Sequence, residues 1–247
     1  MIRTQKRTTS IKTKIMKTTA INYSVCLTQL ENHKLFKHLN NEAVISLLEN
    51  CKYTTWQKGT EFFEGDNSSN NFYIILSGRI KTYKTNFDTD RNYTLSLLGK
   101  GDVVDIMALI DGKKHNINFT TIDEVEVLYT SMTNMRHWME KYPAVYKTFM
   151  PYMSSQMRVM EVNLTDNILA DIPTRLARLF VSNCNESKHL EKINDLSHDE
   201  IANMIGSTRA VVNRHIQQFK RNGIISVQRK QTTILNYQLL TQHVDAF

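Results

Sequence analysis

Five polar side chains near the carboxyl end of the chain have the types and spacing needed to read a double-stranded nucleic acid. They are Arg209, Asn213, Arg214, Gln217 and Lys220. Arginine can donate two hydrogen bonds to guanine, asparagine or glutamine can pair with adenine, and the remaining cations can meet phosphates. An ordinary solvent-facing helix often carries the same residue types, so composition alone leaves both interpretations open.

The residues just before these five predict a first helix and a tight turn. Ser197 and Glu200 have the spacing of a capping box, in which each side chain bonds the backbone of the other residue and a helix begins. Ala202 is small enough to let a second helix cross closely. Gly206 supplies the positive φ that a tight turn between two helices requires.

The second helix is predicted to bury one face and to expose the other. Ser207 or Thr208 would cap it, and Val212, Ile216 and Phe219 recur at the i, i+4, i+7 spacing of a buried face. The five polar residues then lie on the exposed face. The capping residues, the turn glycine, the small residue and the apolar spacing together favour a helix-turn-helix that binds DNA.

Two strand-like runs follow the second helix, at residues 224–227 and 232–237. The sequence between them, Gln228-Arg229-Lys230-Gln231, is polar and carries two cations. This arrangement predicts a β-wing with a basic tip, which would bring Arg229 and Lys230 to the DNA backbone.

A helix with an apolar row is predicted ahead of the DNA-binding segment. The row alternates intervals of three and four residues and consists of Met150, Met153, Met157, Met160 and Leu164. Such a heptad row usually packs against its twin in a parallel dimer, although it could instead pack on the protein's own barrel. We favour the dimer because the run is long and leads into the DNA-binding segment. The Asp-Ile-Pro sequence at 171–173 ends this helix and begins another.

Residues 53–129 contain short runs rich in β-branched and aromatic residues, separated by glycine or by Asn and Asp. Strands at such regular spacing predict an antiparallel barrel or jelly roll. The preceding residues, 30–48, have apolar positions at helical intervals. The predicted order is therefore helix, antiparallel β structure, long helix and helix-turn-helix.

The net charge of +7 is distributed unevenly along the 247 residues. Residues 1–17 hold six basic residues and no acid, residues 18–170 hold 15 basic and 17 acidic residues, and residues 171–247 hold 10 basic and 7 acidic residues. The two ends, and not the middle, suit a polyanionic partner. The first 15 residues could be a disordered basic arm that touches DNA, or they could result from a start codon assigned too early, since a second methionine follows at Met16. We favour the second explanation.

The cysteines and the absence of long apolar runs indicate the compartment. Cys26, Cys51 and Cys184 are well separated and form no C-x-x-C pair, which argues against a disulfide framework and a zinc ribbon. No stretch is apolar for the roughly 18 residues that a membrane span needs. We therefore expect a cytoplasmic protein that does not enter a membrane.

Several stretches together resemble one known family. Residues 58–66, 73–80 and 101–104 look like the glycine-punctuated turns of a cyclic-nucleotide-binding-type β-roll. Residues 171–177 look like a hinge into a winged helix, and residues 207–214 look like a recognition helix. Over nearly all of residues 30–240 the chain resembles the Crp/Fnr family of bacterial regulators.

The resemblance implies an α+β protein with an amino-terminal antiparallel, jelly-roll-like β-roll, a long dimerisation helix and a carboxy-terminal winged helix-turn-helix. We divide the chain into a leader at 1–17, a sensor roll at 18–142, the dimerisation helix at 143–170 and a DNA-binding domain at 171–247. The implied partners are double-stranded DNA with a two-fold-symmetric operator, a second copy of the chain, RNA polymerase and an unidentified small-molecule effector.

Several positions of this sequence match residues with which the family contacts DNA. The resemblance gives Arg209 and Arg214 base and phosphate contacts, and it gives Thr208 and Ser197 phosphate contacts. Ala210 stands where the family often has a glutamate, so we expect the preferred half-site to differ.

The sensor departs further from the family. Members that bind cyclic AMP clamp its ribose and phosphate with a Gly-Glu pair and a later Arg-Ser pair, but this stretch begins Asp105-Ile106-Met107 and has no Arg-Ser. Isoleucine cannot accept a hydrogen bond from the ribose, and an unpaired hydroxyl costs roughly 1–3 kcal/mol. We therefore do not expect cyclic AMP. Lys113 and Lys114 could meet an anionic effector, or they could form a solvated turn.

We expect no cofactor and no metal. The four-cysteine pattern of iron–sulfur members of the family is absent. His115 could ligate haem, but we favour a lone surface histidine.

Two rival functions fit the sequence less well. A cupin-type enzyme on the same barrel would need two or three histidines and a glutamate facing one cavity, and the only histidine in residues 53–129 is His115. A stand-alone effector-binding module would have no use for the recognition helix and the wing. The sequence therefore predicts a transcription regulator and not an enzyme.

Overall fold

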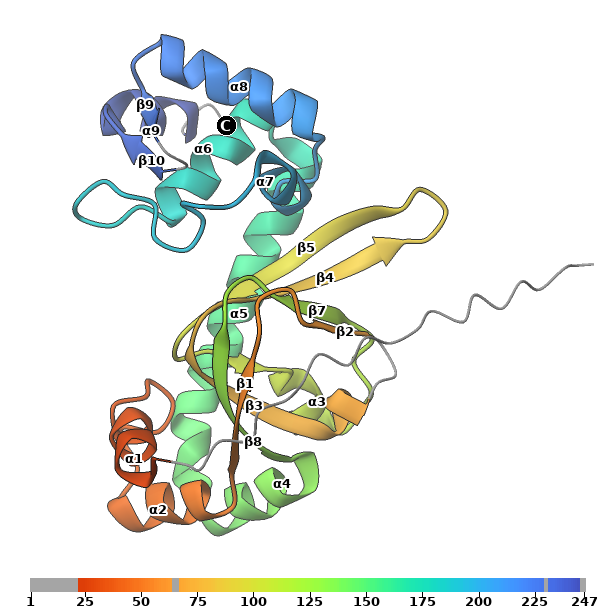
Figure 1. Ribbon diagram of the computed structural model, residues 1–247, viewed down its shortest axis with the longest axis vertical. Coiled ribbons are helices and arrows are strands. Elements are labelled where there is room, and N and C mark those ends of the chain that lie inside the picture. Colours follow the sequence, from red (N-terminus) through yellow and green to blue (C-terminus); the bar gives the residue numbers. More distant parts are fainter. Residues whose placement is uncertain (1–21, 64–66, 229–230, 245–247) are drawn as a thin grey trace, which may run out of the picture.

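The computed structural model describes residues 22–63, 67–228 and 231–244. Two lobes lie at opposite ends of one long helix, α5 (Tyr146–Leu169), which carries the chain from the first lobe to the second (Figure 1). The amino-terminal lobe combines antiparallel sheets with helices, and the carboxy-terminal lobe is mainly helical. The α+β organisation that the sequence predicts is confirmed.

The amino-terminal lobe is a β-roll built from two antiparallel sheets, with strand orders β1-β8-β3-β6 and β2-β7-β4-β5. The strands are β1 Lys52–Trp56, β2 Glu61–Phe62, β3 Asn71–Ser77, β4 Ile80–Asn86, β5 Arg91–Leu98, β6 Val103–Val104, β7 Asn118–Thr121 and β8 Val125–Ser131. Most strands that pair within a sheet are not consecutive in the chain. The chain therefore crosses repeatedly between the two sheets, as in a jelly roll. The ring of Trp56 lies 4.6 Å from that of Phe62 and 5.0 Å from that of Tyr73, so an aromatic cluster joins the two sheets.

Helices pack against one end of the roll. The helices α1 (Tyr23–Glu31), α2 (Asn41–Glu49) and α4 (Met132–Lys141) enclose a second apolar core together with the start of α5. The indole N–H of Trp138 donates to the carbonyl of Ala43 at 3.1 Å, which satisfies the polar atom of a buried ring. A short helix, α3 (Ile106–Asp111), follows β6, and 3-10 turns occupy Asn67–Asn70 (η1) and Pro143–Val145 (η2).

The long helix α5 packs on the roll along one side only. Phe149 and Tyr152 are buried in the core that α1, α2 and α4 enclose, whereas Met157 on another face is 67% exposed. The helix ends at Leu169. The side chain of Asp171 then accepts a hydrogen bond from the backbone N–H of Thr174 at 2.9 Å, and this cap begins α6 (Ile172–Ser182).

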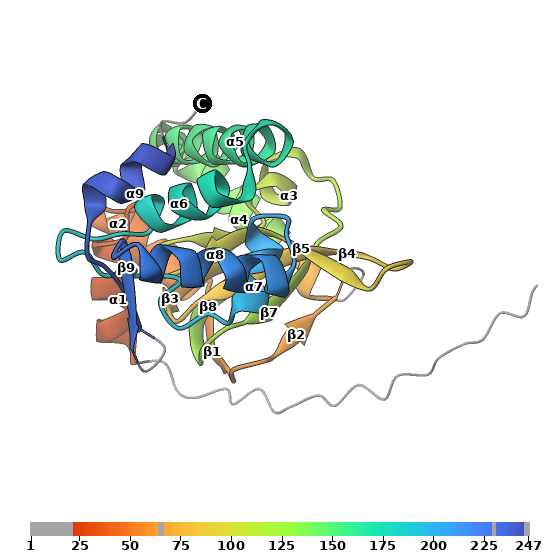
Figure 2. The ribbon, with the colours of Figure 1, turned by 90° about the horizontal axis from the view of Figure 1, so that it is seen from above.

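The carboxy-terminal lobe contains the predicted helix-turn-helix and a two-stranded wing. The helices α6, α7 (His198–Met204) and α8 (Arg209–Arg221) share an apolar core with the antiparallel strands β9 (Ile225–Gln228) and β10 (Gln231–Ile234). A last helix, α9 (Tyr237–Val244), lies beside α6. Seen along the long axis, α6, α8 and α9 lie over the roll and beside the axis of α5 (Figure 2).

The end of the chain corrects the prediction of a strand at 232–237. The strand β10 stops at Ile234 because the next two backbone N–H groups, of Leu235 and Asn236, both donate to the carbonyl of Ile224 and turn the chain. The side chain of Asn236 then accepts a hydrogen bond from the N–H of Leu239 at 2.9 Å. This cap favours the helix α9, which the sequence interpretation missed.

Candidate functional site

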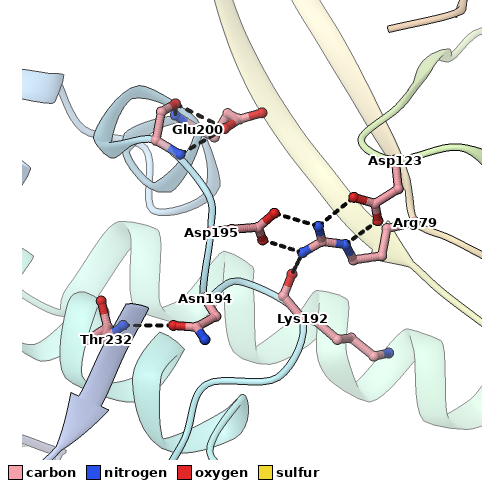
Figure 3. Close-up of polar contacts among 8 residues, drawn as sticks. Arg79, Asp123, Lys192, Asn194, Asp195, Glu200 and Thr232 are labelled. Atoms are coloured by element: carbon pink, nitrogen blue, oxygen red, sulfur yellow. Dashed lines mark hydrogen bonds and ion pairs between the residues drawn. The ribbon is translucent and has the colours of Figure 1, made fainter. Parts of the chain in front are cut away.

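The entry into helix α8 depends on two caps and a glycine. Ser197 accepts a hydrogen bond from the N–H of Glu200 at 3.2 Å, and the carboxylate of Glu200 accepts one from the N–H of Ser197 at 2.9 Å. This is the predicted capping box of α7, visible beside the label of Glu200 in Figure 3. Gly206 has a φ of +64°, and Thr208 caps α8 by accepting from the N–H of Val211 at 3.4 Å.

The two faces of α8 divide as the sequence predicts. Val212, Ile216 and Phe219 are buried in the core of the lobe. The exposed residues include Arg209, Asn213, Arg214, Gln217 and Lys220. The helix lies at the outer edge of the lobe, at the end of the molecule farthest from α1 and α2 (Figure 1), so this polar face is open to a large partner.

The exposed face of α8 is cationic and rich in amides. Residues 209–221 contain four Lys or Arg residues and no acid. One guanidinium nitrogen of Arg214 lies 3.4 Å from Nε2 of its neighbour His215. A surface with this composition can place donors on guanine and on phosphates and can pair amides with adenine.

The wing lies next to α8, and its predicted basic tip, Arg229 and Lys230, falls outside the residues that the structure describes. The flanking residues Gln228 and Gln231 are paired across the two strands. The N–H of Thr232 donates to the side chain of Asn194 at 2.7 Å, which ties the wing to the loop that enters α7 (Figure 3).

Ion pairs that no local sequence pattern predicts join the carboxy-terminal lobe to the roll. Arg79, just before β4, donates to Asp123 of the roll at 2.6 and 2.7 Å and to Asp195 of the other lobe at 2.7 and 2.9 Å (Figure 3). It also donates to the carbonyl of Lys192 at 2.6 Å. These bonds lower the pKa of Asp195 and keep the loop that leads into α7 against the roll. We refer to Arg79, Asp123 and Asp195 as the Arg79 clamp.

A second ionic contact supports the Arg79 clamp. The Nζ of Lys192 lies 3.6 Å from the buried carboxylate of Asp102, which also binds Lys34 at 2.5 Å. Burial alone would raise the pKa of Asp102, but Lys34 and the N–H of Gly99 bond the carboxylate and bring its pKa below the ordinary value. The orientation of the helix-turn-helix is therefore set partly by charges of the roll.

The predicted seam on α5 is largely open to solvent. Met150, Met157, Met160 and Leu164 are 43–67% exposed, whereas Met153 is half-buried against the core of the roll. Further apolar residues of the helix that the sequence interpretation left out are also exposed: Val159, Val162, Ile168 and Leu169. An apolar face of this extent on one helix is typical of an interaction surface.

A cavity of about 720 Å³ lies between β4, β5, the start of α3 and α5, and it reaches Arg175 and Gly206 of the DNA-binding lobe. Three of the five residues predicted for an effector, Asp105, Ile106 and Met107, line it. Lys113 and Lys114 do not, because the loop after α3 turns their side chains into solvent. For these two the prediction of an effector contact is not supported.

His115 is not the lone surface histidine that the sequence suggested. It lines the cavity, its side chain is 30% exposed, and its Nδ1 lies 2.9 Å from the carboxylate of Asp105. The two residues are ten positions apart, and only the turn after α3 brings them together. Sequence reasoning had no local signal for this contact.

The described part of the chain contains neither a cluster of metal-binding side chains nor a helix suited to a membrane. Within residues 22–63, 67–228 and 231–244, no group of three or more His, Cys, Asp or Glu side chains could hold a metal ion. Over the same residues, no helix has the length and apolar character needed to cross a membrane.

Two protein-family models match the chain, one on each lobe. The cyclic nucleotide-binding domain matches residues 53–142, and the Crp-like helix-turn-helix domain matches residues 174–243. Apart from Lys52, all strands of the roll lie within the first range, as does the cavity-lining residue Asp105, and α8 lies within the second.

Relatives that align with most of the chain are regulators. A CRP-like cAMP-activated global transcriptional regulator of Mycobacterium tuberculosis is 24% identical over 213 residues, which span 84% of this chain and 95% of that protein. The global nitrogen regulator of Synechocystis sp. is 24% identical over 218 residues, which span 84% and 93%.

Solved structures show the same fold. FixK2 from Bradyrhizobium japonicum has a TM-score of 0.69 at 18% identity and covers 80% of this chain and 98% of its own. The c-di-GMP responsive regulator CLP from Xanthomonas campestris has a TM-score of 0.68 at 16% identity and covers 80% and 100%.

Proposed function

The chain belongs to the Crp/Fnr family of transcription regulators, and from this premise we propose that it binds a two-fold-symmetric DNA operator as a homodimer. The observation that carries the proposal is the exposed cationic, amide-bearing face of α8 at the outer edge of its lobe. A helix with this face fits the major groove, where base edges present distinct patterns of donors and acceptors.

Within this proposal the exposed residues have separate roles. Arg209 and Arg214 contact bases and phosphates, and Asn213 and Gln217 contact base edges. Lys220 meets the backbone at the far end of the helix, as do Arg229 and Lys230 from the wing. Thr208 and Ser197 contact phosphates through the beginnings of their helices, where backbone N–H groups point outward.

The homodimer is supported by the exposed seam of α5. Two copies of Met150, Met157, Met160 and Leu164 facing each other would remove this apolar surface from water, and Met153 would contribute from its half-buried position. Methionine side chains adapt easily, so the interface tolerates changes of crossing angle. A parallel pair of α5 helices places two α8 helices on the same side of the dimer, as a symmetric operator requires.

An effector at the cavity is proposed to modulate the affinity for DNA. Asp105, Ile106 and Met107 line the cavity, and Ile106 offers no acceptor to a ribose hydroxyl. We therefore do not assign cyclic AMP to this chain, although several relatives are named for it. The proposal also includes RNA polymerase as a partner and the cytoplasm as the location, and it includes no catalytic activity because the relatives are regulators.

A mobility-shift assay with pooled genomic fragments, followed by sequencing of the retarded DNA, tests the function. We expect retarded fragments to share a two-fold-symmetric site. Arg209→Ala should lose roughly 1–3 kcal/mol of affinity for that site while the oligomeric state is unchanged. Lys52→Ala, which removes a cation from an exposed position on β1, serves as the control and should bind normally. Unchanged binding by Arg209→Ala would refute the docking of α8 in the groove.

A further inference from the structure

The cavity beside α5 has a wall that is mainly apolar. Its lining includes Leu98, Val103, Ile106 and Ile117 from the roll and Leu164 from α5. Several of its polar groups already bond one another: the hydroxyls of Thr82 and Ser96 lie 2.7 Å apart, and the amide of Asn167 donates to the hydroxyl of Tyr93 at 2.5 Å. Most of the surface that a ligand would meet is therefore hydrocarbon.

The charges on the wall do not favour an anion. Asp105 and Glu161 contribute carboxylates, and Arg175 is the one Lys or Arg side chain among the lining residues that the structure describes. Its guanidinium donates to the carbonyls of Ala170, Asn167 and Ile205 and to the side chain of Asn167, at 2.8–3.2 Å. Arg175 is thus engaged with these acceptors, and no uncommitted Lys or Arg lines the wall to pair with a phosphate.

Asp105 is held rigidly at this wall. Its backbone has a φ of +64°, and its side chain caps α3 by accepting from the N–H of Ala108 at 3.4 Å. The side chain is 8% exposed, and the oxygen that caps the helix also contacts Nδ1 of His115 at 2.9 Å. A buried carboxylate in this position repels an anionic ligand but can accept a hydrogen bond from a neutral one.

We propose that the cavity binds an uncharged, largely apolar small molecule that donates a hydrogen bond to Asp105, and that it rejects phosphate-bearing nucleotides. This inference rests on the proposed function, since it names the chemical class of the effector at the same site. The ligand would touch the roll, α5 and the first helix of the DNA-binding lobe at once, because all three line the cavity.

A matched pair of fluorescent probes tests whether the cavity prefers an uncharged ligand to an anionic one. N-phenylnaphthylamine is neutral, apolar and carries one N–H donor, and anilinonaphthalene sulfonate has the same rings and N–H with an added negative charge. We expect the neutral probe to bind at one site per subunit, with a dissociation constant at least about tenfold lower than that of the sulfonate. Cyclic AMP should displace neither probe.

Asp105→Asn identifies the residue that sets this preference. Asparagine tolerates a positive φ and can cap α3, so the variant changes charge with little change of backbone. The preference for the neutral probe should fall to about threefold or less. Asp111→Asn is the matched control, since Asp111 lies in the same helix, accepts a backbone hydrogen bond from Lys113 and does not line the cavity. It should keep the wild-type preference.

Ile117→Trp shows whether the probe sits in the cavity, because the larger side chain occupies its space. Circular dichroism confirms that the variant is folded, and the neutral probe should then bind at least about tenfold more weakly.

Three results with the variants and probes would overturn the proposal. They are equal binding of the two probes to wild-type protein, an unchanged preference for the neutral probe in Asp105→Asn, and normal binding of that probe to folded Ile117→Trp. Displacement of the neutral probe by cyclic AMP would also overturn it. Operator binding by the same preparation is measured separately. A protein that binds its operator but does not prefer the neutral probe would contradict this inference and leave the proposed DNA-binding function intact.

Discussion

His33 is a buried histidine whose protonation state follows from its contacts. Its Nδ1 accepts a hydrogen bond from the backbone N–H of Leu35 at 3.2 Å, so the proton of the neutral ring is on Nε2. Burial, with a further contribution from the charge of Lys34, lowers its pKa from 6.5 to about 4. The folded protein therefore holds a neutral ring at pH values where the unfolded chain would be protonated.

This difference predicts a loss of stability in weak acid. Because the folded pKa is the lower one, the unfolded state binds more protons between pH 6.5 and about 4, and the free energy of unfolding falls as the pH falls through this window. The full effect of His33 is about 3 kcal/mol. Urea unfolding of the His33→Asn variant, whose side chain can still accept from Leu35, should show a flatter dependence on pH. The exposed His38→Asn variant serves as control, and a wild-type slope in the His33 variant would refute the assignment.

At the level of the helix, one substitution can measure how much the capping box of α7 contributes to stability. Ser197→Ala removes the acceptor for the N–H of Glu200 and should lower the free energy of unfolding by about 1 kcal/mol. Chemical denaturation monitored by circular dichroism gives this value. Ser187→Ala, in the loop before α7, is the control and should change it by much less. Equal effects of the two substitutions would show that the box contributes nothing.

Elements with local signals were predictable from the sequence, and those that depend on distant contacts were not. The capping box, Gly206 and the apolar spacing of α8 are all encoded within a few residues, and each is found as predicted. The end of β10 depends on the carbonyl of Ile224, which lies more than ten residues earlier in the chain than the N–H groups that donate to it. The cap of α9 at Asn236 is local, and it was missed. The contact between Asp105 and His115 and the Arg79 clamp join residues that only the folded chain brings together, so periodicity and composition give no indication of them.

The exposed apolar seam of α5 predicts that the protein is a dimer. Met157→Asp combined with Met160→Asp would bury charge between paired helices and should convert the proposed dimer to monomers, with weaker binding to the operator. Light scattering measures the mass, and Thr165→Asp, at an exposed position of α5 outside the row, should leave it unchanged. A wild-type protein that is already monomeric at working concentration would contradict the proposal.

At the scale of the whole molecule, the Arg79 clamp links the stabilities of the two lobes. The side chains of Asp123 and Asp195 are 34% and 50% exposed, so water and salt weaken each pair, but the geometry is bidentate on both sides. A double-mutant cycle of Arg79→Met and Asp195→Asn should give a coupling free energy of about 0.5–1 kcal/mol that falls at high salt. Arg158→Met with Asp195→Asn is the control cycle. A coupling of zero at low salt would show that the clamp does not contribute to stability.

The length of chain between the two partners of the clamp also sets an order of events during synthesis. Asp195 follows Arg79 by 116 residues, which a ribosome adding about 5–20 residues per second takes roughly 6–23 s to make. Asp123 follows Arg79 by only 44 residues, so this partner is made well before Asp195. The roll, with both Arg79 and Asp123, is therefore made before the DNA-binding lobe, and domains generally fold as units in the order in which they are made.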